Sequence, residues 1–124
     1  MNLKDELKKV EKLNLRGKEY DVAQVIANLR KAGENENKIK KIVEEEKLIT
    51  LLINKGFKQE NFTTLRYYFN KNKYIVVYQD VDDNVWKARL IENKFDKENY
   101  EFTTTRKDLK SIEEALEMVE GKEA

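Results

Sequence analysis

The sequence predicts an α+β protein in which helices are segregated from an antiparallel sheet. The main evidence lies in residues 65–91, where β-branched and aromatic residues dominate and two polar clusters interrupt them at hairpin spacing. Apolar residues recur at helical spacing on both sides of this stretch. We therefore expect N-terminal helices, a four-stranded antiparallel β-meander and a C-terminal helix. They would form a single domain, 1–124, with a mainly helical part at 1–56 and the meander plus the last helix at 62–124.

Three helices are expected before the sheet. In residues 2–14, leucine and valine recur every three or four positions, as on one face of a helix. A second helix follows an N-cap with a capping-box partner and ends at a glycine, and a third begins after an asparagine. The residues that cap or end these helices are Asp21, Gln24, Gly33 and either Asn35 or Asn37.

The faces of the meander depend on the lengths of its turns. With a two-residue turn at 82–83 or 83–84, odd residues before the turn share a face with even residues after it. The apolar face, expected to be the core, comprises Ile75, Val77, Val81, Trp86, Ala88 and Leu90. A two- or four-residue turn within 70–73 places the odd residues of the first strand on the opposite face, whereas a three-residue turn places them in the core.

The remaining elements follow the meander. Residues 92–98 are polar and are expected to form a loop, and the alternation of apolar and polar residues in 99–104 predicts a fourth strand. Ser111 and Glu114 have capping-box spacing at the start of the last helix. The buried stripe of that helix is expected to comprise Ile112, Ala115, Leu116 and Val119.

Composition excludes several kinds of site. The chain has no cysteine and no histidine, so disulfides, thiolate metal sites and histidine-based catalysis are absent. No phosphate-binding loop or nucleophile motif occurs, and we expect neither an enzyme, a cofactor nor a metal. The acidic segment 80–84 has the residues of a tight turn rather than of a cation site. No apolar run approaches eighteen residues, so we expect a cytoplasmic protein that does not enter the membrane.

The face of the meander opposite the core is the first candidate site. Its aromatic rings and cations suit stacking and contact with an anionic or protein surface. The candidate partner-binding residues are Tyr67, Phe69, Tyr74, Tyr78, Lys87 and Arg89. The alternative is that the N-terminal helices or a second subunit cover this face, the latter giving a homodimer.

A second candidate lies in residues 25–43. Leu29, Gly33, Ile39 and Ile42 have the spacing found across the turn of helix-turn-helix units, although an ordinary αα-hairpin has the same spacing. The side chains that would then face nucleic acid are Asn35, Asn37, Lys40 and Lys41.

These observations favour a small non-catalytic intracellular binding protein. Charged residues make up 40% of the chain but the net charge is only +1, which argues against a strongly basic nucleic-acid binder. In size and in its lack of motifs the chain resembles the small accessory proteins of phages and mobile elements, many of which bind and inhibit a host macromolecule. A protein partner is therefore expected, and the alternative is a nucleic-acid-binding or transcriptional regulator that uses residues 25–43.

Overall fold

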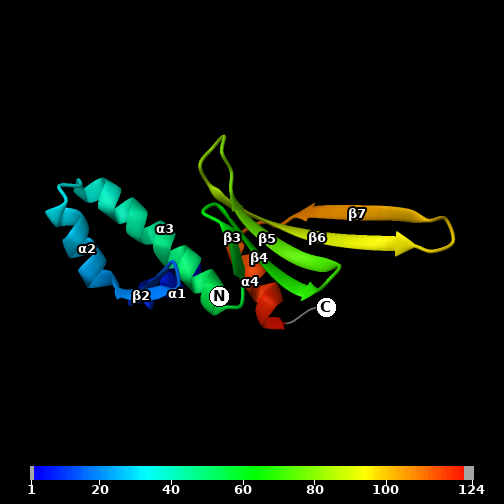
Figure 1. Ribbon diagram of the computed structural model, residues 1–124, viewed down its shortest axis with the longest axis horizontal. Coiled ribbons are helices and arrows are strands. Elements are labelled where there is room, and N and C mark those ends of the chain that lie inside the picture. Colours follow the sequence, from blue (N-terminus) through cyan, green and yellow to red (C-terminus); the bar gives the residue numbers. More distant parts are fainter. Residues whose placement is uncertain (1, 122–124) are drawn as a thin grey trace. The chain divides into compact units, whose positions relative to one another are not determined.

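The computed structural model describes residues 2–121. The chain forms two compact units that divide between Asn54 and Lys55, and each is described by itself. The α+β class is confirmed, with helices and two antiparallel sheets (Figure 1). None of the helices in the described residues is long and apolar enough to cross a lipid bilayer.

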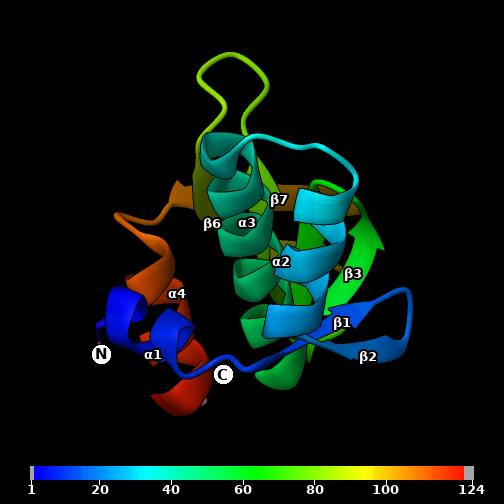
Figure 2. The same ribbon diagram turned by 90° about the vertical axis from the view of Figure 1, so that its left-hand side faces the viewer.

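The first unit consists of three helices and a β-hairpin. Its elements are α1 (Leu3–Lys8), β1 (Lys12–Leu15), β2 (Lys18–Asp21), α2 (Val22–Lys31) and α3 (Glu36–Asn54). The long helix α3 is its centre, because α1, β1 and α2 all contact it (Figure 2). The buried side chains of this unit are Leu13 from the hairpin and Ile39, Val43, Leu48, Ile49, Thr50, Leu51 and Leu52 from α3.

The helix predicted for residues 2–14 is wrong beyond Lys8. The chain instead forms a hairpin in which Arg16 and Gly17, with φ of 54° and 81°, make a two-residue turn between β1 and β2. Positive φ at both positions is typical of the tight turns that suit the twist of paired strands. The fully buried Leu13 fits either period, since leucine at alternate positions also marks a strand.

The predicted ends of α2 and α3 are largely confirmed. Asp21 occupies the N-cap position of α2, but its side chain makes no capping hydrogen bond and Gln24 donates to Asn28 instead, at 3.0 Å. Gly33 follows α2 with φ of 88°, the left-handed conformation that glycine adopts most readily. The side chain of Asn35 caps α3 by accepting a 2.8 Å hydrogen bond from the backbone N–H three residues later.

The second unit is a five-stranded antiparallel sheet with one helix. The strands are β3 (Lys58–Asn61), β4 (Thr64–Asn70), β5 (Lys73–Gln79), β6 (Trp86–Asp96) and β7 (Glu101–Asp108), paired in that order, and the helix is α4 (Ile112–Gly121). The predicted four-stranded meander therefore lacks β3, and residues 92–96, predicted as loop, extend β6. This part of β6 pairs with a fully exposed β7, so it lacks the apolar alternation that marks a half-buried strand. The fourth strand, predicted at 99–104, is β7 and begins at Glu101.

A β-bulge sets the face of the first strand of the meander. Asn70 pairs with Lys73 across a two-residue turn, but the register shifts by one between Tyr68 and Asn70. Phe69 is the extra residue, and beyond it Tyr67 lies opposite Ile75. A two-residue turn thus gives the faces that were expected only for a three-residue turn.

The parity predicted for the second hairpin is confirmed. Val77 pairs with Ala88 and Ile75 with Leu90, so odd residues of β5 share a face with even residues of β6. The turn is longer than the predicted two residues, because it comprises residues 80–85. Val81 lies within it and is 94% exposed rather than buried in the core. Trp86 lies on the core face but is only half-buried.

Helix α4 completes the core of the second unit. Its buried stripe is the predicted one, and its first turn begins as the capping box requires, since the Ser111 hydroxyl accepts a 3.1 Å hydrogen bond from Glu114 N–H. The Glu114 carboxylate in turn accepts from the Lys110 N–H at 2.8 Å. The buried apolar residues of this unit are Phe57, Leu65, Ile75, Val76, Val77, Ala88, Leu109, Ile112, Ala115, Leu116 and Val119.

Candidate binding face of the sheet

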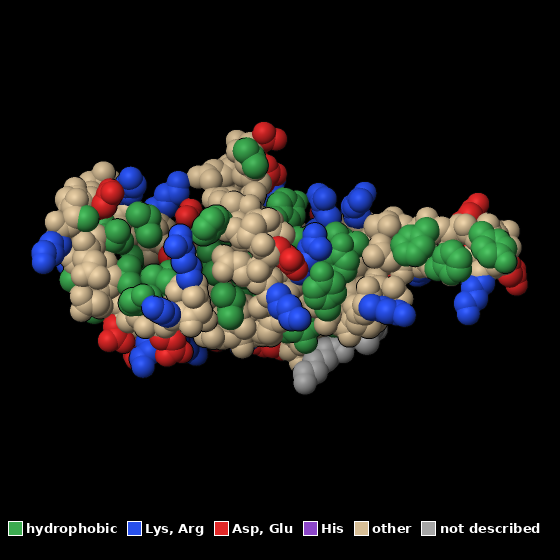
Figure 3. All heavy atoms as spheres, viewed as in Figure 1, with side chains coloured by type: hydrophobic (Ala, Val, Ile, Leu, Met, Phe, Trp, Pro, Cys, Tyr) green, Lys and Arg blue, Asp and Glu red, His purple; other side chains and the backbone are tan. Residues whose placement is uncertain are grey.

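The register defines a face of the five-stranded sheet on the side opposite Leu65, Ile75 and Val77. Side chains alternate across a strand, and paired residues share a face, so its members follow directly from the pairing. On β4, β5 and β6 this outer face comprises Arg66, Tyr68, Tyr74, Val76, Tyr78, Lys87, Arg89 and Ile91. The pairing adds Lys58 of β3, opposite Arg66, and Arg106 and Asp108 of β7, opposite Ile91 and Arg89. Hydrophobic side chains interspersed with Lys and Arg gather over these strands in the space-filling view (Figure 3).

Aromatic rings and guanidinium groups are stacked on the outer face. Tyr68 and Tyr74 lie opposite each other on β4 and β5 with ring centroids 5.1 Å apart. The guanidinium carbon of Arg66 lies 5.3 Å from the Tyr74 ring centroid, and that of Arg89 lies 5.4 Å from that of Tyr78. These distances are within the range of attraction between a cation and an aromatic ring, so the side chains hold one another in place.

Among the outer-face cations of β4, β5 and β6, Arg66 is the one without an acidic partner among the described residues. It forms no ion pair within residues 2–121, and its Nη1 donates a long hydrogen bond of 3.5 Å to the Tyr68 hydroxyl. That hydrogen bond is the main reason that the pKa of Arg66 is raised. Its Nε is shielded from solvent and has no hydrogen-bond partner in the described chain. A buried donor without an acceptor is unfavourable.

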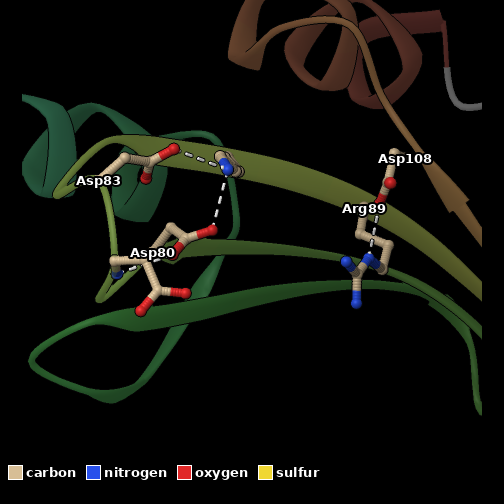
Figure 4. A network of polar contacts seen from close by, with 6 residues as sticks. Asp80, Asp83, Arg89 and Asp108 are labelled. Carbon is tan, nitrogen blue, oxygen red and sulfur yellow. Dashed lines mark hydrogen bonds and ion pairs between the residues drawn. The ribbon is translucent and has the colours of Figure 1, made fainter.

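The other two cations on the β4–β6 part of the face, Lys87 and Arg89, are bound to acids (Figure 4). Lys87 Nζ lies 2.8 Å from Asp80 Oδ2 and 3.0 Å from Asp83 Oδ2, and these hydrogen bonds raise the pKa of the ammonium. Arg89 Nε lies 2.7 Å from Asp108 Oδ1, and this hydrogen bond is the main cause of the raised pKa of Arg89. Both cations are therefore bound locally, which reduces their attraction for a phosphate backbone.

Four of the six predicted partner-binding residues lie on the outer face. They are Tyr74, Tyr78, Lys87 and Arg89. Tyr67 and Phe69 do not, because the bulge turns Tyr67 to the core side, where its ring centroid lies 5.5 Å from that of Phe57 and 5.3 Å from that of Phe69.

The set of predicted partner-binding residues omits Arg66, Tyr68 and Ile91, which share this face. Arg66 and Tyr68 lie at even positions of β4, whereas the predicted Tyr67 and Phe69 lie at odd positions. Choosing between these two sets requires the length of the turn that follows β4. The two-residue turn alone, without the bulge, predicts the wrong set.

A cleft adjoins the outer face where β7 ends. Its volume is about 470 Å³, and its lining includes Tyr78, Trp86, Lys87, Arg89 and Ser111. The indole N–H of Trp86 is shielded from solvent and has no acceptor in the described chain. No group of three or more acidic, histidine or cysteine side chains within residues 2–121 is arranged to hold a metal ion.

The alternative nucleic-acid residues lie on an αα-hairpin. Helices α2 and α3 are side by side in both ribbon views (Figures 1 and 2). Asn37, Lys40 and Lys41 are exposed on α3, whereas the Asn35 side chain is occupied by capping that helix. Acids lie among these cations, and Arg30 at the end of α2 is bound to Glu36 at 2.8 Å.

Comparisons with known proteins identify no relative. No family model matches the chain, and neither a curated protein nor a solved structure is significantly similar to it.

Proposed function

We propose that this chain is a small non-catalytic binding protein whose outer sheet face contacts another protein. The role would be of the kind that accessory proteins of phages and mobile elements have when they inhibit a host macromolecule. The observation that carries the proposal is the stacked group of Arg66, Tyr68 and Tyr74, which leaves Tyr68 42% exposed on a surface that its own unit does not use as core. Tyrosine and arginine are the residue types enriched at the energetic centres of protein interfaces.

The residue types of the outer face favour a protein partner over nucleic acid. Two of its cations, Lys87 and Arg89, are bound to Asp80, Asp83 and Asp108, which reduces their attraction for a phosphate backbone. Ring stacking already fixes the rotamers of these side chains, so binding would cost little additional side-chain entropy.

A matched pair of tyrosine variants tests the proposal. Tyr20 on β2 is 41% exposed, against 42% for Tyr68, and belongs to the other unit. In a pull-down from nuclease-treated lysate, Tyr68→Ala should lose the protein that the wild-type chain captures, whereas Tyr20→Ala should retain it. Capture that survives Tyr68→Ala, or that disappears on nuclease treatment, would contradict the proposed protein-binding face.

A further inference from the structure

The two edges of the five-stranded sheet differ in their protection against pairing. Edge strands expose unpaired backbone groups, and proteins usually shorten, bulge or interrupt them. At one edge, β3 has four residues and a register shift between Gln59 and Asn61. At the other, β7 has eight residues, all exposed, with no register shift against β6. The chain also contains no proline, so β7 lacks these three protections, and its charged residues, Glu101, Arg106, Lys107 and Asp108, are of both signs.

The backbone groups at the open side of β7 belong to its even-numbered residues. Leu109 N–H donates to the Ala88 carbonyl at 2.9 Å, which continues the β6–β7 ladder by one pair. Hydrogen-bonded pairs alternate along an antiparallel ladder, so odd-numbered residues of β7 bond to β6. The N–H and C=O groups of Phe102, Thr104 and Arg106 therefore point away from the sheet.

Three charged side chains of β7 also lack an ionic partner within residues 2–121. Glu101, Arg106 and Lys107 form no ion pair within the described chain. Phe102 is 67% exposed, and among the described residues its one ring contact is with Phe95, which is itself 53% exposed. This aromatic pair and its hairpin extend beyond the end of β5 (Figure 1).

We infer that β7 pairs with β7 of a second copy of this chain, antiparallel and with a two-fold axis at Thr104. Because outward-pointing residues must meet outward-pointing residues, the axis has to pass through a residue, and axes at Thr104 and Thr105 give the longest overlap of the two strands. With the axis at Thr104, Glu101 lies opposite Lys107 of the second copy. The same axis places Phe102 opposite Arg106, with a threonine pair at the centre.

The neighbouring registers lack this complementarity. An axis at Thr103 places Glu101 opposite Thr105 of the second copy, and an axis at Thr105 places Phe102 opposite Asp108. Opposite charges and cation–aromatic pairs across strands are stabilising, and the symmetry of the pair makes each contact occur twice. The composition of β7 thus selects a second copy as the partner, independently of what binds the outer face.

Proline at the axis tests whether the strands pair. The Thr104 N–H points away from β6, so Thr104→Pro leaves the β6–β7 ladder intact while removing a donor from the new edge. Sedimentation equilibrium should show a concentration-dependent dimer for the wild-type chain and a monomer for Thr104→Pro, with unchanged circular dichroism. A wild-type monomer at roughly millimolar concentration, where even weak pairs associate, or a Thr104→Pro dimer as tight as wild type, would overturn the inference.

Cysteine scanning tests the register, because the chain has no cysteine of its own. Directly opposed residues of an antiparallel pair have the separation that a disulfide requires. Thr104→Cys should therefore cross-link to itself on mild oxidation. Thr103→Cys and Thr105→Cys should cross-link efficiently only when the two variants are mixed. Self-linking of either one in preference to Thr104→Cys would refute the proposed axis.

Charge exchange tests the complementarity itself. Glu101→Lys places two lysines opposite each other at both ends of the pair and should raise the dimer Kd by roughly tenfold. Adding Lys107→Glu restores opposite charges and should return the Kd to near the wild-type value. Equal Kd values for Glu101→Lys and the wild-type chain would count against pairing in this register.

Discussion

Lys87 Nζ donates a 2.8 Å hydrogen bond to Asp80 Oδ2, which connects the loop between β5 and β6 to the start of β6. This hydrogen bond is the largest cause of a lowered pKa for Asp80, and a second is the Asp82 backbone N–H, which donates to the same carboxylate at 2.9 Å. The negative charge of Asp80 is therefore favoured in the folded state.

The first prediction concerns acid stability. A carboxyl group whose pKa is lowered by folding stabilises the native state above its unfolded pKa and loses that contribution as the pH falls through the folded value. Asp80→Asn should thus lower the urea midpoint at about pH 6 more than at about pH 2.5. Asp82→Asn, in the same loop, is the control. Equal losses for Asp80→Asn at both pH values would contradict the assignment.

The second prediction concerns Glu46 on α3, a half-buried carboxyl group. Burial raises its pKa, and the neighbouring charge of Glu45 adds to the effect. A raised folded pKa means that the charged form destabilises the fold at neutral pH, and that this penalty disappears as the pH falls through the folded value toward the unfolded one. Glu46→Gln should therefore raise the melting temperature at about pH 7 and change it little near pH 3.

The control for Glu46 is a neighbouring glutamate. Glu44 is exposed on the same helix, so Glu44→Gln tests whether removing any one negative charge has the same effect. A melting temperature raised equally by Glu44→Gln and Glu46→Gln would show that net charge, rather than burial of Glu46, determines the change.

Sequence reasoning succeeded where one face of an element is buried. The four apolar positions of α4 recur at helical spacing and are all buried. The alternation of Ile75 and Val77 likewise located the core face of β5. In both cases one face is buried, so apolar residues recur at the period of the helix or of the strand, and this period can be seen in the sequence.

Sequence reasoning failed where pairing rather than burial specifies the structure. Residues 92–96 are polar except for Phe95, because both faces of that part of β6 are largely open to solvent, so no alternation indicates the strand. The bulge at Phe69 depends on backbone pairing across the hairpin, which no side-chain pattern reports. Two of the predicted binding residues were misplaced for this one reason.

The third prediction concerns the αα-hairpin as an alternative nucleic-acid reader. Because Glu44, Glu45 and Glu46 follow the exposed Lys40 and Lys41 on the same helix, we expect no measurable DNA affinity at ~50 mM salt, where non-specific binding is normally detectable. Fluorescence anisotropy with a labelled duplex measures this directly. If DNA does bind, and Lys40→Ala with Lys41→Ala flattens the salt dependence by about two counterions, the hairpin is a DNA-binding element and this prediction is wrong.

The last prediction compares neighbours on opposite faces of β5. Ile75 is fully buried, and Ile75→Ala should cost about 2–5 kcal/mol of the free energy of unfolding because it leaves a cavity in the core. Tyr74 contacts Tyr68 and Arg66 on the outer face, so Tyr74→Ala should cost only about 1 kcal/mol through lost cross-strand contacts. Urea denaturation measures both values. If Tyr74→Ala proved as destabilising as Ile75→Ala, the outer face would be a second core rather than a binding surface. Loss of the captured protein by Tyr74→Ala, with most of the stability retained, is what a surface used for binding requires.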